Sequence, residues 1–128
     1  MTQQLDDILL LEDNALLLDS MINSLPKDVS YAAITSGKQL QDHLESGSRA
    51  KLYFFDDTMP SVNTGLTQPS FIEHHQLLTS HDLAARVFYH GSAISDETKQ
   101  YCNGSGVMQV SRHNISEVIE SHRNLLRQ

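Results

Sequence analysis

The stretch LYFFDDTMP, residues 52–60, begins with four apolar or aromatic residues and continues with two adjacent aspartates and a Met-Pro pair. A short apolar run of this kind is typical of a β-strand that is covered on both faces, as in a parallel sheet. We predict a strand over KLYFFD, residues 51–56, with Asp56 and Asp57 at its carboxyl end. Two carboxylates are thus placed at the end of one strand. Their role depends on which other residues of the chain lie beside them.

Short apolar runs alternate with segments of helical period along the chain. Strands are predicted at ILLLE (8–12), VSYAAIT (29–35), KLYFFD (51–56), RVFYH (86–90) and VMQV (107–110). Helices are predicted at residues 14–25, 36–46, 70–81, 95–102 and 114–126. Three of these helices begin with residues in capping-box spacing, namely Ser36 with Gln39, Ser70 with Glu73, and Asn114 with Glu117. Strict alternation with short connections requires parallel strands and right-handed crossovers, so we expect an α/β fold with a doubly wound sheet of five strands.

Length and composition narrow the possible classes of function. The 128 residues fit a single domain, 1–128, with a core of ordinary size. A formal net charge of −7 without any basic cluster argues against a nucleic-acid partner. No apolar run is long enough to span a membrane, and the first residues lack the features of a signal peptide, so a cytoplasmic location is expected.

Histidine and cysteine give weaker signals. The seven histidines share no tight metal-ligand spacing with one another or with Cys102, so they are expected to be solvated or partly packed. Cys102, the single cysteine, cannot form an internal disulfide, which fits a reducing compartment.

Acidic side chains follow two of the predicted strands. Glu12 and Asp13 come after the first strand, and Asp56 and Asp57 after the third. Ligands of doubly wound sheets bind at the carboxyl ends of the strands, near the point where the strand order reverses. If these two strands are neighbours, the carboxylates meet in one pocket, where their repulsion requires a cation. A hard cation with oxygen ligands, such as Mg²⁺, suits this cluster.

The chain as a whole resembles the receiver domain of bacterial two-component response regulators (CheY-like). The resemblance is carried by ILLLEDN, by LYFFDDTMP, by a small hydroxyl residue after the fourth strand and by a cation after the fifth. It implies a flavodoxin-like sheet with the strand order 2-1-3-4-5. It also implies that Asp56, four residues before the proline, accepts a phosphoryl group from a histidine kinase or phosphotransfer protein.

The resemblance further implies a Mg²⁺ site and a set of partners. Glu12, Asp13, Asp56 and the backbone carbonyl of Thr58 would hold the metal ion. The phosphorylated protein would then change its binding to a downstream target protein, and it could form a homodimer through the fifth strand and the last helix. Such a chain is a phosphoacceptor and not an enzyme that acts on an external metabolite.

Several positions depart from the receiver pattern. The hydroxyl expected after the fourth strand falls on Ser92, or on Gly91 if the apolar run alone is aligned. Arg112 replaces the usual lysine and keeps a positive charge with a different reach. Gln109 stands at the position of the aromatic switch residue, and the loop 61–69 is several residues longer than usual.

Two interpretations therefore remain open, a phosphorylatable receiver and a degenerate receiver that acts as a phosphorylation-independent interaction module. A haloacid-dehalogenase-like phosphohydrolase would need a second aspartate two residues after the nucleophile, where this chain has Thr58. Neither TSGKQL nor CNGSGVMQVS forms a P-loop, so no nucleotide cofactor is predicted.

Overall fold

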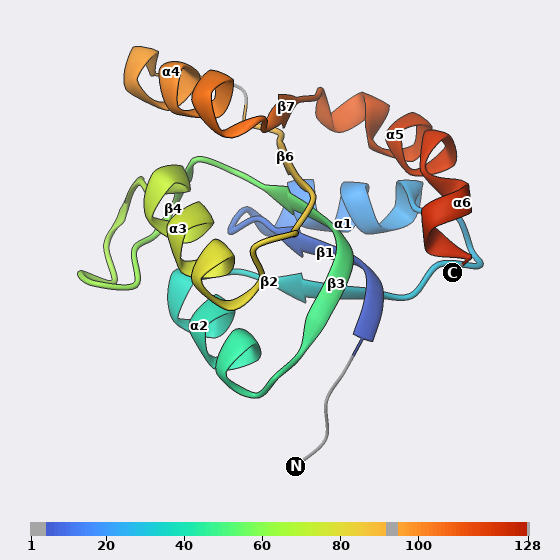
Figure 1. The fold of residues 1–128 in the computed structure, drawn as a ribbon, viewed down its shortest axis with the longest axis horizontal. Coiled ribbons are helices and arrows are strands. Elements are labelled where there is room, and N and C mark those ends of the chain that lie inside the picture. The colour runs from blue at the N-terminus through green and yellow to red at the C-terminus, as the bar shows by residue number, and fades with distance from the viewer. Residues whose placement is uncertain (1–4, 92–94, 128) are drawn as a thin grey trace.

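The computed structural model describes residues 5–91 and 95–127 of the chain. Five parallel strands form the central sheet in the spatial order β2-β1-β3-β6-β7 (Figure 1). They are β1 (Leu5–Leu11), β2 (Tyr31–Ile34), β3 (Arg49–Phe55), β6 (Val87–Tyr89) and β7 (Met108–Gln109). Numbered along the chain within this sheet, the order is 2-1-3-4-5, so the predicted α/β fold and its topology are confirmed.

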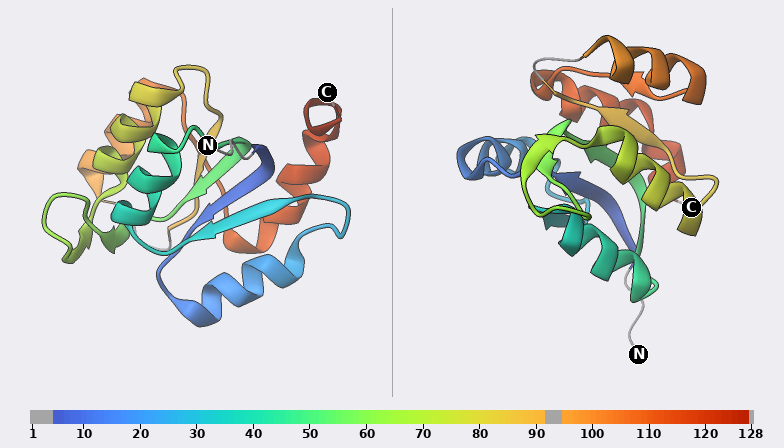
Figure 2. Two further views of the ribbon diagram at one scale, coloured as in Figure 1. Left: turned by 90° about the horizontal axis from the view of Figure 1, so that it is seen from below. Right: turned by 90° about the vertical axis from the view of Figure 1, so that its left-hand side faces the viewer.

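Helices cover both faces of the sheet (Figure 2). Their bounds are α1 (Ala15–Ser24), α2 (Gly37–Glu45), α3 (Phe71–His81), α4 (Asp96–Ser105), the 3₁₀ helix η1 (Arg112–Asn114), α5 (Ile115–Ser121) and α6 (Arg123–Leu126). Apolar residues of α1, α5 and α6 pack on one face, and those of α2, α3 and α4 on the other. The helix predicted over 114–126 is divided at His122, whose backbone leaves the helical region with φ −111° and ψ 17°.

The central strands explain why their sequences are continuously apolar. Successive side chains of a strand point to opposite faces of the sheet. Leu52 and Phe54 therefore enter one core, while Tyr53 and Phe55 enter the other, and all four are fully buried. Strand β1 begins at Leu5 and not at residue 8, because Leu5 and Asp6 already pair with Arg49 and Ala50 of β3.

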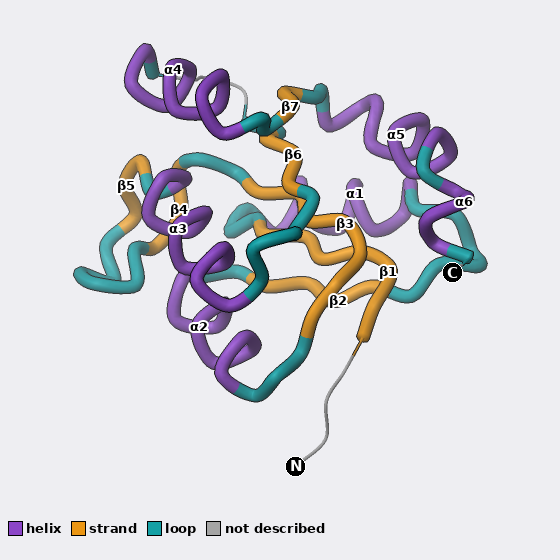
Figure 3. Tube along the Cα trace, viewed as in Figure 1, coloured by secondary structure: helices purple, strands orange, loops and turns teal. Residues whose placement is uncertain are grey.

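A second, two-stranded sheet interrupts the expected alternation. Strands β4 (Thr58–Pro60) and β5 (Thr67–Pro69) pair antiparallel and form a hairpin within the long segment between β3 and α3. Figure 3 shows the hairpin beside α3, outside the main sheet. Met59 of β4 is fully buried and joins the core. The prediction of a loop over 61–69 is wrong for its last three residues, because they form β5.

The predicted capping boxes have different outcomes. At Ser36 the side chain accepts a hydrogen bond from the N–H of Gln39, as expected for an N-cap. At Ser70 the prediction is wrong, because its Oγ donates to the carbonyls of Met59 and Gln68. The carboxylate of Glu73 instead accepts hydrogen bonds from the hairpin, namely from the Ser61 hydroxyl and from the N–H groups of Val62 and Asn63.

Two other predictions are corrected in the C-terminal half. Asn114 makes no side-chain capping bond to α5. Helix α4 runs on to Ser105, past Cys102, and ends at Gly106, whose φ of 73° is the left-handed conformation that glycine adopts without strain. Among the described residues, none of the helices combines the length and apolar character needed to cross a membrane.

Candidate functional site

Two carboxylates meet at the carboxyl ends of β1 and β3. Leu11 and Phe55 are register partners, so the next residues, Glu12 and Asp56, leave the sheet side by side. The N–H of Asp56 donates to the carbonyl of Leu11 at 3.1 Å, which fixes this register at the strand ends. Glu12 is 1% exposed and Asp56 is 7% exposed. The sheet thus buries both acidic groups at one point.

His90 completes this cluster from the neighbouring strand β6. Tyr89 is the register partner of Phe55, and the N–H of His90 donates to the carbonyl of Phe55 at 3.0 Å. One ring nitrogen of His90 and one carboxylate oxygen each of Glu12 and Asp56 lie within 4.8 Å of one another. The prediction that the histidines are solvated or partly packed is wrong here, because His90 is 1% exposed.

The imidazole of His90 is only partly hydrogen-bonded. Nε2 lies 3.2 Å from the carbonyl oxygen of Leu11, to which it can donate. Nδ1 is buried and has no hydrogen-bond partner among the described residues. A neutral imidazole has one donor and one acceptor nitrogen, so the acceptor of this tautomer remains unsatisfied.

Arg112, the first residue of η1, supplies the positive charge. Its Nε donates to Oε1 of Glu12 at 3.2 Å, and its Nη2 lies 3.7 Å from Oδ1 of Asp56. One guanidinium therefore faces two carboxylates, and the cluster keeps an excess of negative charge when both are ionised.

The other predicted site residues have different surroundings. Asp13, next to Glu12, is only partly buried and lies outside the cluster of ligating atoms found among the described residues. Thr58 is exposed and begins β4. Ser92, the favoured position for the hydroxyl, lies outside the described residues. Gly91 is described, and a β-carbon at this position would lie 2.5 Å from the hydroxyl oxygen of Tyr89.

Gln109 lies in β7 as the register partner of Tyr89 and is exposed. The aromatic ring at the end of the fourth strand of the main sheet is instead that of Tyr89, which is buried. Burial, together with the charges of Asp57 and Asp56, raises the pKa of this tyrosine. The phenol is therefore held in its neutral form next to the acidic cluster.

Burial shifts the pKa values of two groups in the cluster, Glu12 and His90. It raises the pKa of Glu12 to about 7, and the negative charge of Asp56 adds to this shift, while the N–H of Asn14 and Arg112 oppose it. Burial lowers the pKa of His90 to about 4, with Arg112 adding to the shift and Asp56 opposing it. At neutral pH the imidazole is therefore uncharged, and the Glu12 carboxyl is partly protonated.

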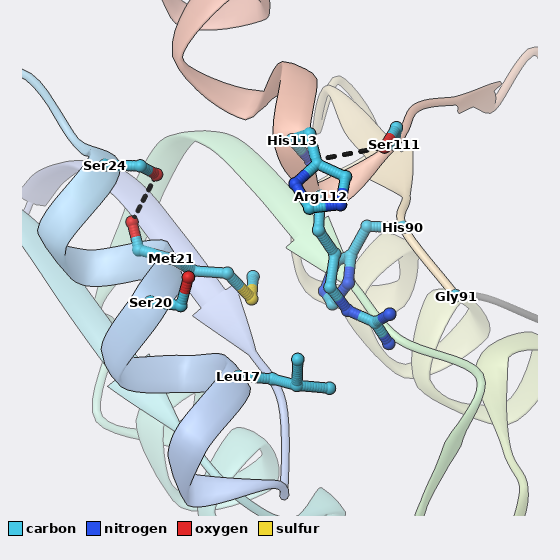
Figure 4. Close-up of a pocket in the computed structure, with 9 residues that line it drawn as sticks. All are labelled: Leu17, Ser20, Met21, Ser24, His90, Gly91, Ser111, Arg112 and His113. Carbon is cyan, nitrogen blue, oxygen red and sulfur yellow. Dashed lines mark hydrogen bonds between the residues drawn. The ribbon is translucent and has the colours of Figure 1, made fainter.

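A pocket of about 470 Å³ opens beside the cluster, between α1 and the start of η1. Figure 4 shows Leu17 and Met21 of α1 facing Arg112 and His90 across this pocket. The remaining lining residues are Ser20, Ser24, Gly91, Ser111 and His113. A small solute can therefore reach Arg112, whose side chain is 19% exposed, while the buried imidazole of His90 forms part of the pocket wall.

Sequence reasoning missed His90, although a signal for it was present. The fourth predicted strand, RVFYH, ends in this histidine just as the third ends in Asp56. Because parallel neighbours β3 and β6 are in register, the residue after Tyr89 must stand beside the residue after Phe55. The receiver pattern instead points to the two residues that follow, Gly91 and Ser92.

No protein-family model matches the chain, and no curated protein matches its sequence. Solved structures do match its fold. A CheY-like response regulator receiver domain protein from Methanospirillum hungatei JF-1 has a TM-score of 0.71 and 16% identity, covering 97% of this chain and 98% of that one. A response regulator receiver protein from Sinorhizobium medicae WSM419 has a TM-score of 0.69 and 19% identity, over 95% and 94% of the two chains.

The response regulator LqsR of Legionella pneumophila is similar as well, with a TM-score of 0.69 and 11% identity. The match covers 97% of this chain but only 44% of LqsR. At these identities the similarity establishes the fold alone. The predicted resemblance to response regulator receivers is confirmed at that level, and the chain has a divergent receiver fold.

Proposed function

We propose that this chain is a two-component receiver whose Asp56 accepts a phosphoryl group from a histidine kinase or phosphotransfer protein. One observation carries the proposal, the placement of the buried Asp56 carboxylate beside Glu12 and Arg112 at the carboxyl end of β3. In doubly wound sheets this end of the strands is where ligands bind. The protein would act as a phosphoacceptor and not on an external metabolite.

The transfer would be a displacement at phosphorus. An oxygen of Asp56 attacks the phosphoryl group, the O–P bond forms, and the P–N bond of the donor phosphohistidine breaks with its electron pair returning to the imidazole. Arg112 already lies 3.7 Å from Asp56, and its planar guanidinium can donate two hydrogen bonds to phosphoryl oxygens. Arg112 therefore takes the place of the lysine expected in receivers.

The carboxylates of Glu12 and Asp56 fit a divalent cation, because they are buried, adjacent and only partly neutralised by Arg112. The ligands proposed from the sequence are Glu12, Asp13, Asp56 and the carbonyl of Thr58, with Mg²⁺ as the ion. When bound, such an ion offsets negative charge on the phosphoryl oxygens.

The second candidate function is a phosphorylation-independent interaction module. Exposed Gln109 at the aromatic switch position favours it, since no aromatic ring can be buried there on activation. In either case the proposed partner surface is the edge of the sheet at β7 together with α5, where Met108 is 60% exposed. A target protein or a second copy of the chain could bind this edge.

The two functions are separated by titrating the protein with Mg²⁺ and beryllofluoride, a mimic of the phosphoryl group, while recording amide NMR spectra. For a working receiver we expect shifts that spread from Asp56 to β7 and α5 and that are absent in Asp56→Asn. A wild-type spectrum that keeps its dispersion but does not respond would exclude phosphorylation and leave the interaction module.

A further inference from the structure

We infer that His90 is a metal ligand together with Glu12 and Asp56, and that the site prefers divalent ions that accept imidazole nitrogen, such as Mn²⁺, Co²⁺ or Zn²⁺, over Mg²⁺. This inference rests on the metal site of the proposed function and changes both its ligands and its ion. Three features of the site support it: the spacing of the ligating atoms, the hydrogen bonding of His90, and the chemistry of the donor set.

The spacing suits a common metal ion. One potential ligand atom from each of Glu12, Asp56 and His90 lies within 4.8 Å of the others. Metal–ligand bonds to nitrogen and carboxylate oxygen are about 2.0–2.2 Å, so three ligands of one ion lie on average at most about 3.8 Å apart. Side-chain adjustments of up to about 1 Å bring the three donors of this site around one ion.

The three donors are also positioned by the backbone. Glu12, Asp56 and His90 follow β1, β3 and β6. Their own N–H groups donate to the carbonyls of Ile34, Leu11 and Phe55, respectively. The sheet therefore sets the distances between the main-chain positions of the ligands, and binding an ion requires no rearrangement of the strands.

His90 has the hydrogen bonding of a ligating histidine. Histidines that bind metals usually donate their other ring N–H to a carbonyl or carboxylate, which fixes the tautomer. Here Nε2 lies 3.2 Å from the carbonyl of Leu11, while buried Nδ1 has no partner among the described residues. A buried imidazole nitrogen without a partner is costly, and a metal ion would satisfy the lone pair that this ring keeps.

The donor set selects the class of ion. Mg²⁺ takes oxygen ligands in a strict octahedron and gives up its waters reluctantly, whereas imidazole is a favourable ligand for zinc and other transition-metal ions. Two carboxylates and one neutral imidazole are a mixed oxygen and nitrogen set. Arg112 competes for this set, because its guanidinium lies 3.2 Å from Oε1 of Glu12 and 3.7 Å from Oδ1 of Asp56, and a bound ion replaces these contacts.

The full chain is first freed of metal and then titrated with Mg²⁺ by calorimetry, with Mn²⁺ by electron paramagnetic resonance, and with Co²⁺ by visible absorption. The variants are His90→Gln, Asp56→Asn and, as a control for adventitious histidine binding, His81→Gln, which alters an exposed histidine at the end of α3. We expect His90→Gln to weaken Mn²⁺ and Co²⁺ binding by at least about tenfold and Mg²⁺ binding by less than about threefold.

A second readout uses only the wild type, in case His90→Gln does not fold. On titration with Zn²⁺, a ring nitrogen of His90 should shift in long-range ¹H–¹⁵N spectra. An unchanged ratio of Mn²⁺ to Mg²⁺ affinity in folded His90→Gln, or an unmoved His90 ring nitrogen, overturns the inference.

Failure of this inference differs from failure of the proposed function. If Asp56→Asn abolishes Mg²⁺ binding while His90→Gln leaves the metal preference unchanged, the inference fails and the receiver function stands. If ions bind through His90 but beryllofluoride has no effect, the inference stands and the phosphoacceptor function fails.

Discussion

The N–H of Asp57 donates to Oδ1 of Asp56 at 2.8 Å, yet the two neighbouring carboxylates serve different parts of the molecule. Asp56 faces Glu12 and His90, whereas Oδ1 of Asp57 accepts a hydrogen bond from the N–H of Phe71 in the first turn of α3. The carbonyl of Asp57 also accepts from Ser70 at 2.7 Å. Asp57 is thus an anchor for α3, and Asp56 alone belongs to the site.

Replacing Asp57 with alanine should therefore reduce stability without removing the chemistry of Asp56. The N–H of Phe71 would lose its acceptor in a buried position, which costs about 1–3 kcal/mol. Urea denaturation measures this loss, and the metal titration of Asp57→Ala should resemble that of the wild type. Loss of metal binding in a folded Asp57→Ala protein would instead place Asp57 in the site.

The raised pKa of Glu12 makes the metal-free protein less stable as the pH rises. Between its ordinary pKa of 4.5 and its folded value of about 7, the native state holds a proton that the unfolded chain has released. The extra proton stabilises the native state fully below pH 4.5, and this contribution is lost as the pH rises through about 7. We expect Glu12→Gln to be more stable than the wild type at pH 8 by about 1–3 kcal/mol and to lose that advantage near pH 4.

His90 has the opposite dependence on pH. Its pKa falls from 6.5 to about 4 on folding, so its contribution to stability is present above 6.5 and lost as the pH falls through about 4. The unfolding free energy of the wild type should therefore fall relative to that of His90→Gln as the pH decreases from 6.5 to about 4. Denaturation curves in the presence of a chelator measure it, and a difference that does not vary with pH would mean that the imidazole is not held neutral.

Removing the charge of Arg112 should destabilise the metal-free protein. Arg112→Gln leaves the buried carboxylates of Glu12 and Asp56 without a cation, at a cost of about 2–4 kcal/mol. This cost is somewhat lower than that of breaking a fully buried ion pair, because the contact between Arg112 and Asp56 is long. Added Mn²⁺ should recover more stability in this variant than in the wild type, because the ion no longer competes with the guanidinium.

The matched control for Arg112→Gln is Arg123→Gln, which removes an arginine paired with the exposed carboxylates of Asp28 and Glu120. Its effect on thermal denaturation should be smaller and should not respond to Mn²⁺. Equal losses for the two variants would contradict the role given to Arg112.

The hairpin can be released from α3 by one substitution. In Glu73→Ala the N–H of Val62 and the hydroxyl of Ser61 lose their shared acceptor. Amide hydrogen exchange in the segment 61–69 should then rise by about one to two orders of magnitude, which corresponds to about 1–3 kcal/mol, while the central sheet keeps its protection. Faster exchange throughout the sheet would show that the hairpin is part of the core's cooperative unit.

Much of the fold could be predicted because the buried strands have a simple signature. The runs around Leu9 and Phe54 are apolar on both faces, and their alternation with helical segments leaves few topologies. The hairpin could not be predicted, since β4 and β5 have three residues each and both end in proline, a residue that argues against strands. Glu73 was misassigned because capping-box spacing is local, while its partners come from tertiary structure.

The site was predictable in part for the same reason. Glu12, Asp56 and Arg112 follow apolar runs or sheet strands, and the rule that ligands gather at strand ends brings them together. His90 depends on the register between β3 and β6, which is a property of the pairing and not of either segment alone.

The backbone bond from His90 to the carbonyl of Phe55 has an evolutionary consequence. Since the main chain fixes where this residue stands, any side chain encoded there will be presented beside Asp56. A single codon change can therefore alter the chemistry next to the acidic residue while the scaffold is inherited intact.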